Sequence, residues 1–329
     1  MYLLEFAGEE DTFSIREAES RCSNVEHLAP GLGTADGVRD VETLAYTRRV
    51  CELVGTCHSS IDDAVGILES ASFDREGTVA VRARDVRGLA SIDTQRAERE
   101  LGRVLVERGL EVDLDSPDET LLAFFSETAA LGWLETESVR DFSDRQPTQK
   151  PFFQPGSMDP MDARALANIA RAGPDARLLD PMCGTGGILV EAGLAGAAVV
   201  GVDAQSKMVR GARRNLGAYL EDEYETLLGD ATRLPFVERS READTTRTDF
   251  PFDGIVFDAP YGRQSKIAGR PLEELLESTL VEVRRLAPIA VVVCDRPCNV
   301  VAARAGWTIE SRFDRRVHRS LTRYVHVLQ

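Results

Sequence analysis

Lysine is nearly absent from this chain of 329 residues. Lys150, Lys207 and Lys266 are the only lysines among 39 basic residues, and Asp and Glu total 55, which gives a formal net charge of −16. Such a balance favours either a protein that avoids nucleic acid or a proteome-wide acidic bias of the halophilic kind. The chain-wide scarcity of lysine favours the second interpretation. Because the Debye length falls to about 3 Å in molar salt, the net charge does not exclude RNA.

Cysteine, histidine and long apolar runs are also scarce. The six cysteines and four histidines show no metal-ligand spacing, although Cys294 and Cys298 are close, which favours reduced structural thiols over a zinc site. The opening residues, MYLLEFAGEED, lack the leading positive charge of a signal peptide, and no apolar run approaches transmembrane length. We expect a cytoplasmic protein with no membrane or metal partner. No signal for an oligomer is present, so a monomer is the simplest expectation.

The pattern of the sequence changes near residue 150. Before it, short alternating strands mix with helices, as in an α+β region: residues 78–84 alternate as a strand, and residues 94–109 have the period of an amphipathic helix that ends at Gly109. Residues 141–159 contain three prolines and show neither a helical nor a strand period, which indicates a linker. The expected domains are an α/β subdomain at 1–70, an α+β module at 71–140, a linker at 141–159 and a third domain at 160–329.

Strands alternate with helices throughout the last domain. This order predicts an α/β fold with a doubly wound, mostly parallel sheet. Residues 237–250 are polar without a period, which indicates a surface insert. The expected helices are 160–172, one opening at 186–187, 205–219 and 271–286, and the expected strands end at Asp180, Asp203, Asp230 and Asp258 or cover 289–293, 306–316 and 320–328.

A glycine-rich turn follows the first of these strands. Its sequence, DPMCGTGG, begins at Asp180. Gly184 and Gly186 permit tight backbone geometry and leave no Cβ in the way of a ligand, although two glycines alone also fit a plain turn. Asp203 and Asp230 end the next two strands, at the rim where open parallel sheets bind ligands. One carboxylate can bind both ribose hydroxyls and the other the exocyclic amine of adenine, so the pattern predicts an adenosine-containing cofactor.

Two cofactor classes compete for this turn. A nicotinamide fingerprint needs a third glycine at position 189, where this chain has Leu189. The Asp-x-x-x-Gly-x-Gly start instead resembles that of class I S-adenosylmethionine (SAM) methyltransferases, which implies that Asp180 faces the cationic methionine end of SAM. The cofactor-binding residues predicted in this way are Asp180, Met182, Cys183, Gly184, Thr185, Gly186, Asp203 and Asp230.

The segment Asp258-Ala259-Pro260-Tyr261 follows another buried strand. It resembles the Asp-Pro-Pro-Tyr signature of amino-methyltransferases, which act on exocyclic nitrogens whose lone pairs are delocalised. In this interpretation Asp258 and the carbonyl of Ala259 each accept an amine N–H. Pro260 shapes the loop, and Tyr261 stacks on a flipped base. The alternative is a plain turn after a strand. This chain has Ala259 where the signature has proline. Because the role at that position belongs to the backbone carbonyl, we expect the difference to affect the rate of the reaction more than its chemistry.

Residues from about 75 to 135 resemble a THUMP domain, an RNA-binding module of tRNA-modifying enzymes. The matching parts are residues 81–84, 98–102 and 112–117. Segments 150–158, 163–168, 180–192 and 318–323 are similar to the archaeal tRNA guanine-10 N2-methyltransferases. That resemblance implies a Rossmann-like methyltransferase domain, a THUMP domain that holds the acceptor end of tRNA, and methylation of the exocyclic amine of guanine 10, usually twice. A base in a stem must be extruded to be reached.

Arginines gather near the end of the chain. They form either an exposed hairpin face or contacts to tRNA phosphates near the active site. Two other functions stay open: a THUMP methyltransferase acting on guanine 6 of tRNA or on ribosomal RNA, and an RNA-binding protein that lacks efficient chemistry or awaits a partner. The predicted RNA-binding residues within this cluster, which also includes Arg312, are Arg315, Arg316, Arg319 and Arg323.

Overall fold

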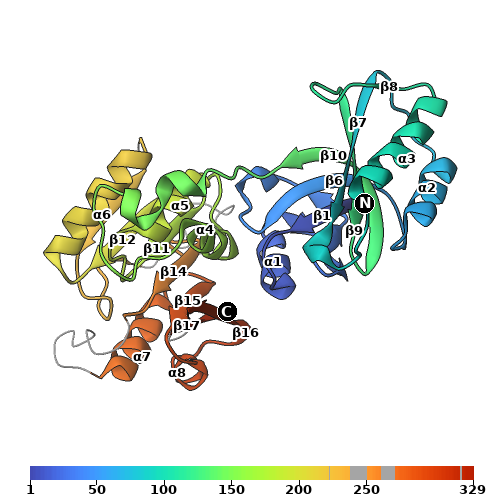
Figure 1. Cartoon of the computed structure of the whole chain (residues 1–329). Coiled ribbons are helices and arrows are strands. Elements are labelled where there is room, and N and C mark those ends of the chain that lie inside the picture. Colours follow the sequence, from blue (N-terminus) through green and yellow to red (C-terminus); the bar gives the residue numbers. More distant parts are fainter. Residues whose placement is uncertain (222, 238–249, 261–270, 319–320) are drawn as a thin grey trace. The chain divides into compact units, whose positions relative to one another are not determined.

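The structure, a computed structural model, describes residues 1–221, 223–237, 250–260, 271–318 and 321–329. The chain divides into two compact units, Met1–Val139 and Arg140–Gln329 (Figure 1). No helix in these described ranges is long and apolar enough to cross a membrane.

One eight-stranded sheet forms the frame of the first unit. Its strands are β1 (Tyr2–Phe6), β3 (Glu26–Ala29), β4 (Leu32–Ala35), β6 (Thr47–His58), β7 (Thr78–Asp85), β8 (Glu111–Val112), β9 (Glu119–Phe125) and β10 (Thr128–Glu137). They are ordered β3-β4-β1-β6-β10-β9-β7-β8. The long antiparallel pair of β6 and β10 joins the stretch before residue 70 to the stretch after it. The segments expected as separate subdomains at 1–70 and 71–140 therefore share one sheet.

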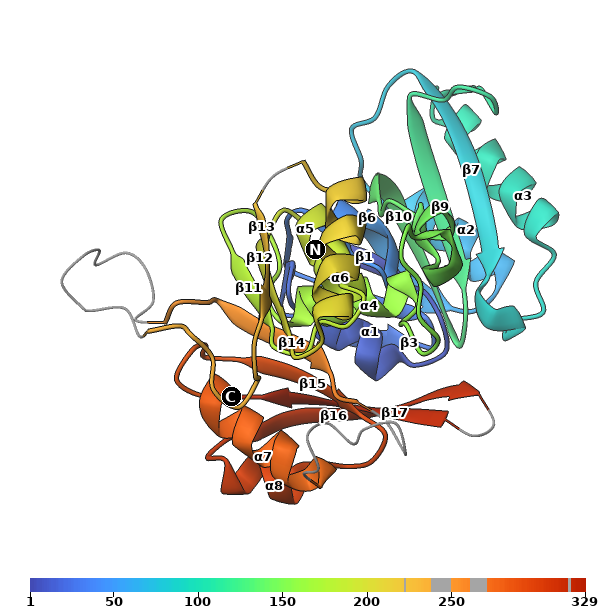
Figure 2. The same ribbon diagram turned by 90° about the vertical axis from the view of Figure 1, so that its left-hand side faces the viewer.

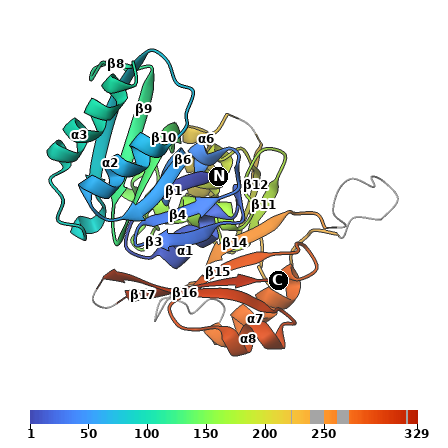
Figure 3. The ribbon, with the colours of Figure 1, turned by 90° about the vertical axis from the view of Figure 1, so that its right-hand side faces the viewer.

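Helices α2 (Ile61–Ser70) and α3 (Thr94–Glu107) pack side by side against this sheet, as Figure 3 shows. Asp93 caps α3 by accepting the N–H of Arg96 at 3.0 Å, and Gly109 leaves the helix with a φ of +96°, which L-residues with a side chain rarely adopt. The shorter elements of this unit are α1 (Asp11–Ala18), β2 (Cys22–Ser23), β5 (Gly37–Val38) and the 3-10 turns Val41–Thr43 and Val86–Gly88.

A seven-stranded sheet forms the frame of the second unit. Its strands are β11 (Arg177–Asp180), β12 (Ala198–Asp203), β13 (Tyr224–Leu228), β14 (Gly254–Asp258), β15 (Ala290–Cys294), β16 (Ile309–His318) and β17 (Leu321–Leu328). The order is β13-β12-β11-β14-β15-β17-β16. The first five strands in this order run parallel, and the last two join them as an antiparallel hairpin. The doubly wound, mostly parallel sheet predicted from the sequence is confirmed.

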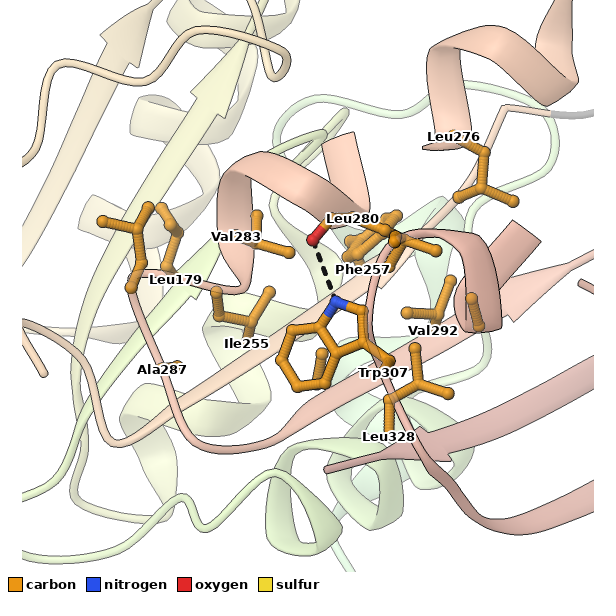
Figure 4. Packing of buried hydrophobic residues seen from close by; sticks show 14 of the residues in the cluster. Leu179, Ile255, Phe257, Leu276, Leu280, Val283, Ala287, Val292, Trp307 and Leu328 are labelled. Carbon is orange, nitrogen blue, oxygen red and sulfur yellow. Dashed lines mark hydrogen bonds between the residues drawn. The ribbon is translucent and has the colours of Figure 1, made fainter. Parts of the chain in front are cut away.

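Helices cover both faces of this sheet (Figure 2). They are α4 (Pro160–Ile169), α5 (Gly187–Leu194), α6 (Ser206–Tyr219), α7 (Leu272–Val283) and α8 (Asn299–Arg304). Leucine and valine side chains of α7 meet the apolar strands β11, β14 and β15 in one buried cluster. Figure 4 shows Trp307 within that cluster, where its indole N–H donates to the carbonyl of Leu280 at 2.9 Å. That hydrogen bond satisfies the only polar atom of the indole.

Several of these elements differ from the expectation. The six-residue helix α8 was not expected, because it is too short to show a helical period. Helices α4 and α7 end at Ile169 and Val283 instead of residues 172 and 286, and β13 ends at Leu228, so Asp230 lies two residues beyond its strand. Of the expected surface insert at 237–250, residues 238–249 lie outside the described ranges.

Residues 141–159, expected as a linker, pack on the second unit. Two 3-10 turns, Phe142–Arg145 and Pro147–Gln149, begin this segment. Farther along, Asn215 of α6 accepts the N–H of Phe152 and donates to its carbonyl, both at 2.8 Å. Satisfied backbone groups and buried side chains hold this stretch in place, although its prolines and lack of a period predict an open connection.

An arginine of the same segment completes a buried ion cluster. The guanidinium of Arg145 donates to Glu191 of α5 at 2.8 Å, and Arg164 of α4 donates to the other oxygen of Glu191 at 3.0 Å. The Glu191 side chain is fully buried, and both arginines are nearly so. We call these three residues the arginine–glutamate cluster. It joins the segment before α4 to two helices of the unit.

Candidate functional site

Three carboxylates end neighbouring parallel strands of the second unit. Asp180 closes β11 at the centre of the sheet, and Asp203 and Asp258 close β12 and β14 on either side of it. Because the carboxyl ends of parallel strands share one edge of a sheet, the alternation of strands and helices is enough to bring these side chains together. This edge is where the sequence places its two motifs.

The glycine-rich turn takes the backbone form that its sequence predicts. Gly184 and Gly186 have φ values of +52° and +75°. A Cβ on Gly186 would lie 3.2 Å from the Cβ of Ala212, whereas a Cβ on Gly184 would meet nothing within 4 Å. Gly186 is therefore needed for packing of the turn against α6, and Gly184 leaves backbone open to a ligand.

Backbone N–H groups orient the carboxylate that follows β12. Asp203 accepts the N–H of Gly184 at 3.0 Å through one oxygen and the N–H of Gln205 at 2.8 Å through the other. Burial raises the pKa of Asp203, and these two hydrogen bonds oppose the rise. The glycine turn and the ribose-binding candidate thus form one connected structure.

A cavity of about 500 Å³ opens along this edge of the sheet. Its lining includes Asp180, Met182, Cys183, Gly184, Thr185, Asp203 and Asp230, which are seven of the eight predicted cofactor residues. Gly186 instead shapes the turn behind them. Asp258, Ala259 and Pro260 form part of the wall. Seven predicted cofactor residues and three of the four predicted catalytic residues are therefore brought together around one space.

The cavity is strongly acidic. Four carboxylates line it, and none of the lining residues within the described ranges is basic. Burial raises the pKa of Asp180 well above its ordinary value; the N–H of Met182 opposes this rise, and the neighbouring Asp203 and Asp258 add to it. Crowded carboxylates without a cation favour a positively charged ligand and disfavour a phosphate. A sulfonium group with ribose hydroxyls fits such a lining, and a nicotinamide dinucleotide does not.

Asp258 is the carboxylate at the far wall. Burial raises its pKa to about 7, and the cation of Arg323 opposes the rise. Arg323 of β17 lies with Nη2 at 3.8 Å from the Asp258 Oδ2 atom, and the same nitrogen donates to the carbonyl of Gly156 at 3.4 Å. The Oδ1 atom of Asp258 is buried, and within the described residues no hydrogen bond reaches it, so this acceptor is left unsatisfied by the fold.

The four predicted RNA-binding arginines are placed differently from one another. Arg316 is exposed on β16. Arg315 is half-buried and donates to Asp162 of α4 at 2.9 Å. Arg323 is buried beside Asp258, and Arg319 lies outside the described residues, as does the predicted catalytic Tyr261. Strand register explains part of this separation. Arg315 and Arg323 are opposite each other on the two strands and so share one face of the hairpin, whereas Arg316, opposite Thr322, is on the other face.

One side of the cavity was missed by the sequence analysis. Residues 154–158 line it, and Ser157 lies 3.2 Å from Thr185 of the glycine turn, hydroxyl to hydroxyl. The segment carries a proline-glycine pair and no period, which indicates a loop without indicating what it covers. Its similarity to the methyltransferase family was the only available sign.

No metal site accompanies this cavity. Across the described ranges, no group of three or more His, Cys, Asp or Glu side chains is arranged to hold a metal ion.

Comparison with known proteins agrees with this geometry. A profile of the RMKL-like methyltransferase domain matches residues 147–325. The tRNA (guanine(10)-N2)-dimethyltransferase of Methanothermobacter thermautotrophicus is 33% identical over 297 residues, covering 87% of this chain and 83% of the relative. The protein of the same name from Pyrococcus abyssi is 29% identical over 304 residues, covering 91% and 88%.

A solved structure shares the fold over the whole chain. The crystal structure of TrmN from Thermus thermophilus aligns with a TM-score of 0.50 and 24% identity, covering 100% of this chain and 99% of that one. The family predicted from the sequence motifs is confirmed by the profile and by the relatives. The chain therefore belongs to the RMKL-like methyltransferase domain family and to the family of archaeal tRNA (guanine(10)-N2)-dimethyltransferases.

Proposed function

We propose that this protein methylates the exocyclic N2 amine of guanine 10 in tRNA, using SAM, and carries the product to N2,N2-dimethylguanosine. The observation that carries the proposal is the wall of the acidic cavity. There Asp258, which has a buried oxygen without a hydrogen-bond partner among the described residues, lines the same space as the glycine turn, Asp180 and Asp203.

The residues around the cavity divide the binding of SAM between them. Asp203 binds the ribose hydroxyls, and Asp230 receives the exocyclic amine of adenine. Asp180 faces the methionine end, where its negative charge complements the sulfonium. Gly184 and the residues beside it, Met182, Cys183 and Thr185, supply the backbone wall of the site.

Asp258 acts on the acceptor amine. SAM, when bound, supplies an electrophilic methyl group. Asp258 accepts one N–H of the amine and the carbonyl of Ala259 accepts the second, which directs the nitrogen lone pair into the acidic cavity. As the N–C bond forms, the S–CH3 bond of the sulfonium breaks and leaves the thioether S-adenosylhomocysteine, and the amine loses a proton. A carboxylate whose pKa is about 7 can take that proton and release it to water. Pro260 and Tyr261 complete the loop, with Tyr261 stacking on the extruded base.

The first unit supplies the tRNA contact in this proposal. Residues 71–140 act as a THUMP domain that holds the acceptor end, with 1–70 as its accompanying subdomain. On the second unit, Arg316 and Arg319 contact phosphates. Arg323 has a different role here: it is buried beside Asp258 and stabilises the negative charge of that carboxylate. Arg315 binds Asp162 of α4 instead of a phosphate.

The test is transfer of labelled methyl groups to transcribed tRNA, with the modified nucleotide mapped by nuclease digestion. We expect label at guanine 10 and none after its replacement by adenine. Asp258→Ala should lower turnover by about 10²- to 10⁴-fold while the Kd for SAM is unchanged. Label at guanine 6 or in ribosomal RNA would indicate the other THUMP methyltransferases, and tRNA binding without transfer would indicate a non-catalytic or partner-dependent protein.

A further inference from the structure

A second cavity lies on the other side of the catalytic loop. It has a volume of about 330 Å³ and shares Ala259 and Pro260 with the acidic cavity. Its remaining lining comes from β15 and the turn after it, from α8, from the start of α7 and from Arg312 of β16. Two spaces that meet at one short wall suit a transfer between two molecules. If the first holds the methyl donor, the second is placed for the acceptor.

Strand register fixes which residues face the catalytic loop in this second cavity. Asp258 of β14 is opposite Val293 of β15, and the N–H of Ala259 donates to the carbonyl of Val293 at 2.8 Å. Two residues after this last register pair, just beyond the ends of the two strands, the chain reaches Pro260 after β14 and Asp295 after β15. Neighbouring strands are about 4.8 Å apart, so the two carboxylates follow adjacent strands at the same edge.

The lining of the second cavity is mostly apolar with few polar groups. Pro260, Leu276 and Val301 provide apolar surface on which a planar ring can pack. The amide oxygen of Asn299 already lies 3.2 Å from Nε2 of His326. Two carboxylates line the cavity: Glu273 of α7, which pairs with Arg304 at 3.2 Å, and Asp295, which follows the strand next to β14. Asp295 is therefore the candidate anionic acceptor.

The present partner of Asp295 is easily exchanged. Its carboxylate is hydrogen-bonded by Arg296, the next residue, at 2.9 and 3.3 Å. The Arg296 side chain is 70% exposed, and ion pairs of this kind contribute little free energy. A donor that enters the cavity can replace the guanidinium at one of the two oxygens.

Guanine presents two donors on one edge, the N1–H and the N2 amine, whereas adenine has an acceptor at N1. Flipped bases are identified by hydrogen bonds to this edge. On the basis of the proposed function, we propose that Asp295 accepts the N1–H of the target guanine while Asp258 accepts the amine. Asp295 is then the residue that selects guanine, and the second cavity is the base site.

The test combines a residue change with a base change. 2-Aminopurine carries the 2-amine of guanine but no N1–H, so it removes the proposed hydrogen bond from the substrate side. On tRNA with guanine, Asp295→Ala should lower kcat/KM at least about tenfold, and Asp295→Asn, which keeps an acceptor, should lie between that variant and the unchanged protein. On tRNA with 2-aminopurine at the target, Asp295→Ala should cause no loss, because N1 of that base carries no proton to donate. Asp295→Asn, whose amide N–H can donate to N1, should be at least as fast as the unchanged protein.

Controls separate this role from a structural one. The Kd for SAM and the unfolding midpoint should be the same for all three proteins. Glu277→Ala, which removes a carboxylate from α7 outside both cavities, should leave both substrates unaffected. An equal loss for Asp295→Ala on guanine and 2-aminopurine, or no loss on either, overturns the inference.

Failure of the proposed function gives a different result. In that case the unchanged protein transfers no methyl group to the guanine tRNA at all. The affinities of the same two tRNAs, measured with S-adenosylhomocysteine present, then decide the matter. A guanine preference that Asp295→Ala removes supports the base site, and equal affinity for both tRNAs in the unchanged protein overturns it.

Discussion

Two sets of buried charges in the second unit differ in whether the carboxylates are paired with arginines. In the arginine–glutamate cluster, each oxygen of Glu191 receives a guanidinium N–H. At the edge of the sheet, Asp180 and Asp258 crowd together with raised pKa values, and the nearest cation, Arg323, stays 3.8 Å from Asp258. Burying a charge is costly unless it is paired. The first set is paired within the fold, and the second keeps acceptors for a ligand.

The largest expected effect comes from removing the centre of the paired set. Glu191→Gln leaves the guanidiniums of Arg145 and Arg164 buried without their shared carboxylate, and should lower the free energy of unfolding by about 3–5 kcal/mol. Denaturant titration measures it. The matched control is Glu107→Gln, which breaks the exposed pair with Arg103 and should show no change. Equal midpoints for the two variants would contradict the comparison.

Removing a charge from the unpaired set should stabilise the protein, the opposite of the effect of Glu191→Gln. The pKa of Asp258 is raised from 3.8 to about 7, so the folded state binds more protons than the unfolded state between these values, and stability falls as pH rises through this window. Asp258→Asn removes that dependence and should stabilise the protein by on the order of 1–4 kcal/mol at pH 8. Thermal unfolding at pH 4 and pH 8 tests this: the variant should gain only at pH 8.

Arg323 is a buried cation, like the arginines of the first set, but it lies beside a carboxylate of the second set that it does not fully pair. Asp180 and Cys294 also face Asp258 electrostatically, and neither supplies a positive charge. Arg323→Met should raise the pKa of Asp258 further, so that turnover, which needs the ionised form, rises with pH about one unit later. Arg323→Lys should restore much of the original profile. The kcat–pH profile decides, and a uniform loss at every pH would indicate a purely structural role.

The smallest effect is expected for charge outside both sets. Arg316 is exposed on β16, and in the proposed function it contacts a phosphate. Arg316→Glu should weaken tRNA binding a few-fold and reduce the salt dependence of log Kd by about one, with the Kd for SAM unchanged. Arg304→Glu on α8 is the control. Because Arg315 holds Asp162, changing it as well would mix a fold effect with a binding effect.

The sequence predicted the parallel sheet and its cofactor edge for a physical reason. Strand-ending aspartates and positive-φ glycines are local features, and parallel topology brings such features together without further information. Asp180, Asp203 and Asp258 were found in this way.

Other parts depend on contacts that have no local pattern. The pairing of Arg323 with Asp258 joins β17 to β14 across β15, and neither strand carries a sign of it. Helix α8 is too short for a period. Asn215, which holds the segment before α4, resembles any other polar residue of an amphipathic helix. These features arise from tertiary packing, which one sequence does not display.

The packed segment at 141–159 also changes what connects the two units. Val139 is hydrogen-bonded to Glu42 of the first unit, and Phe142 is already buried in the second. Only Arg140 and Asp141 lie between Val139 and Phe142. The connection is therefore a short stretch of chain, whereas a free chain over 141–159 could extend about 60 Å. In the proposed function, a longer connection would let the first unit hold the tRNA over a wider range of distances from the acidic cavity. Glycine–serine residues inserted after Val139 would make the enzyme less strict about which guanine along the tRNA it modifies.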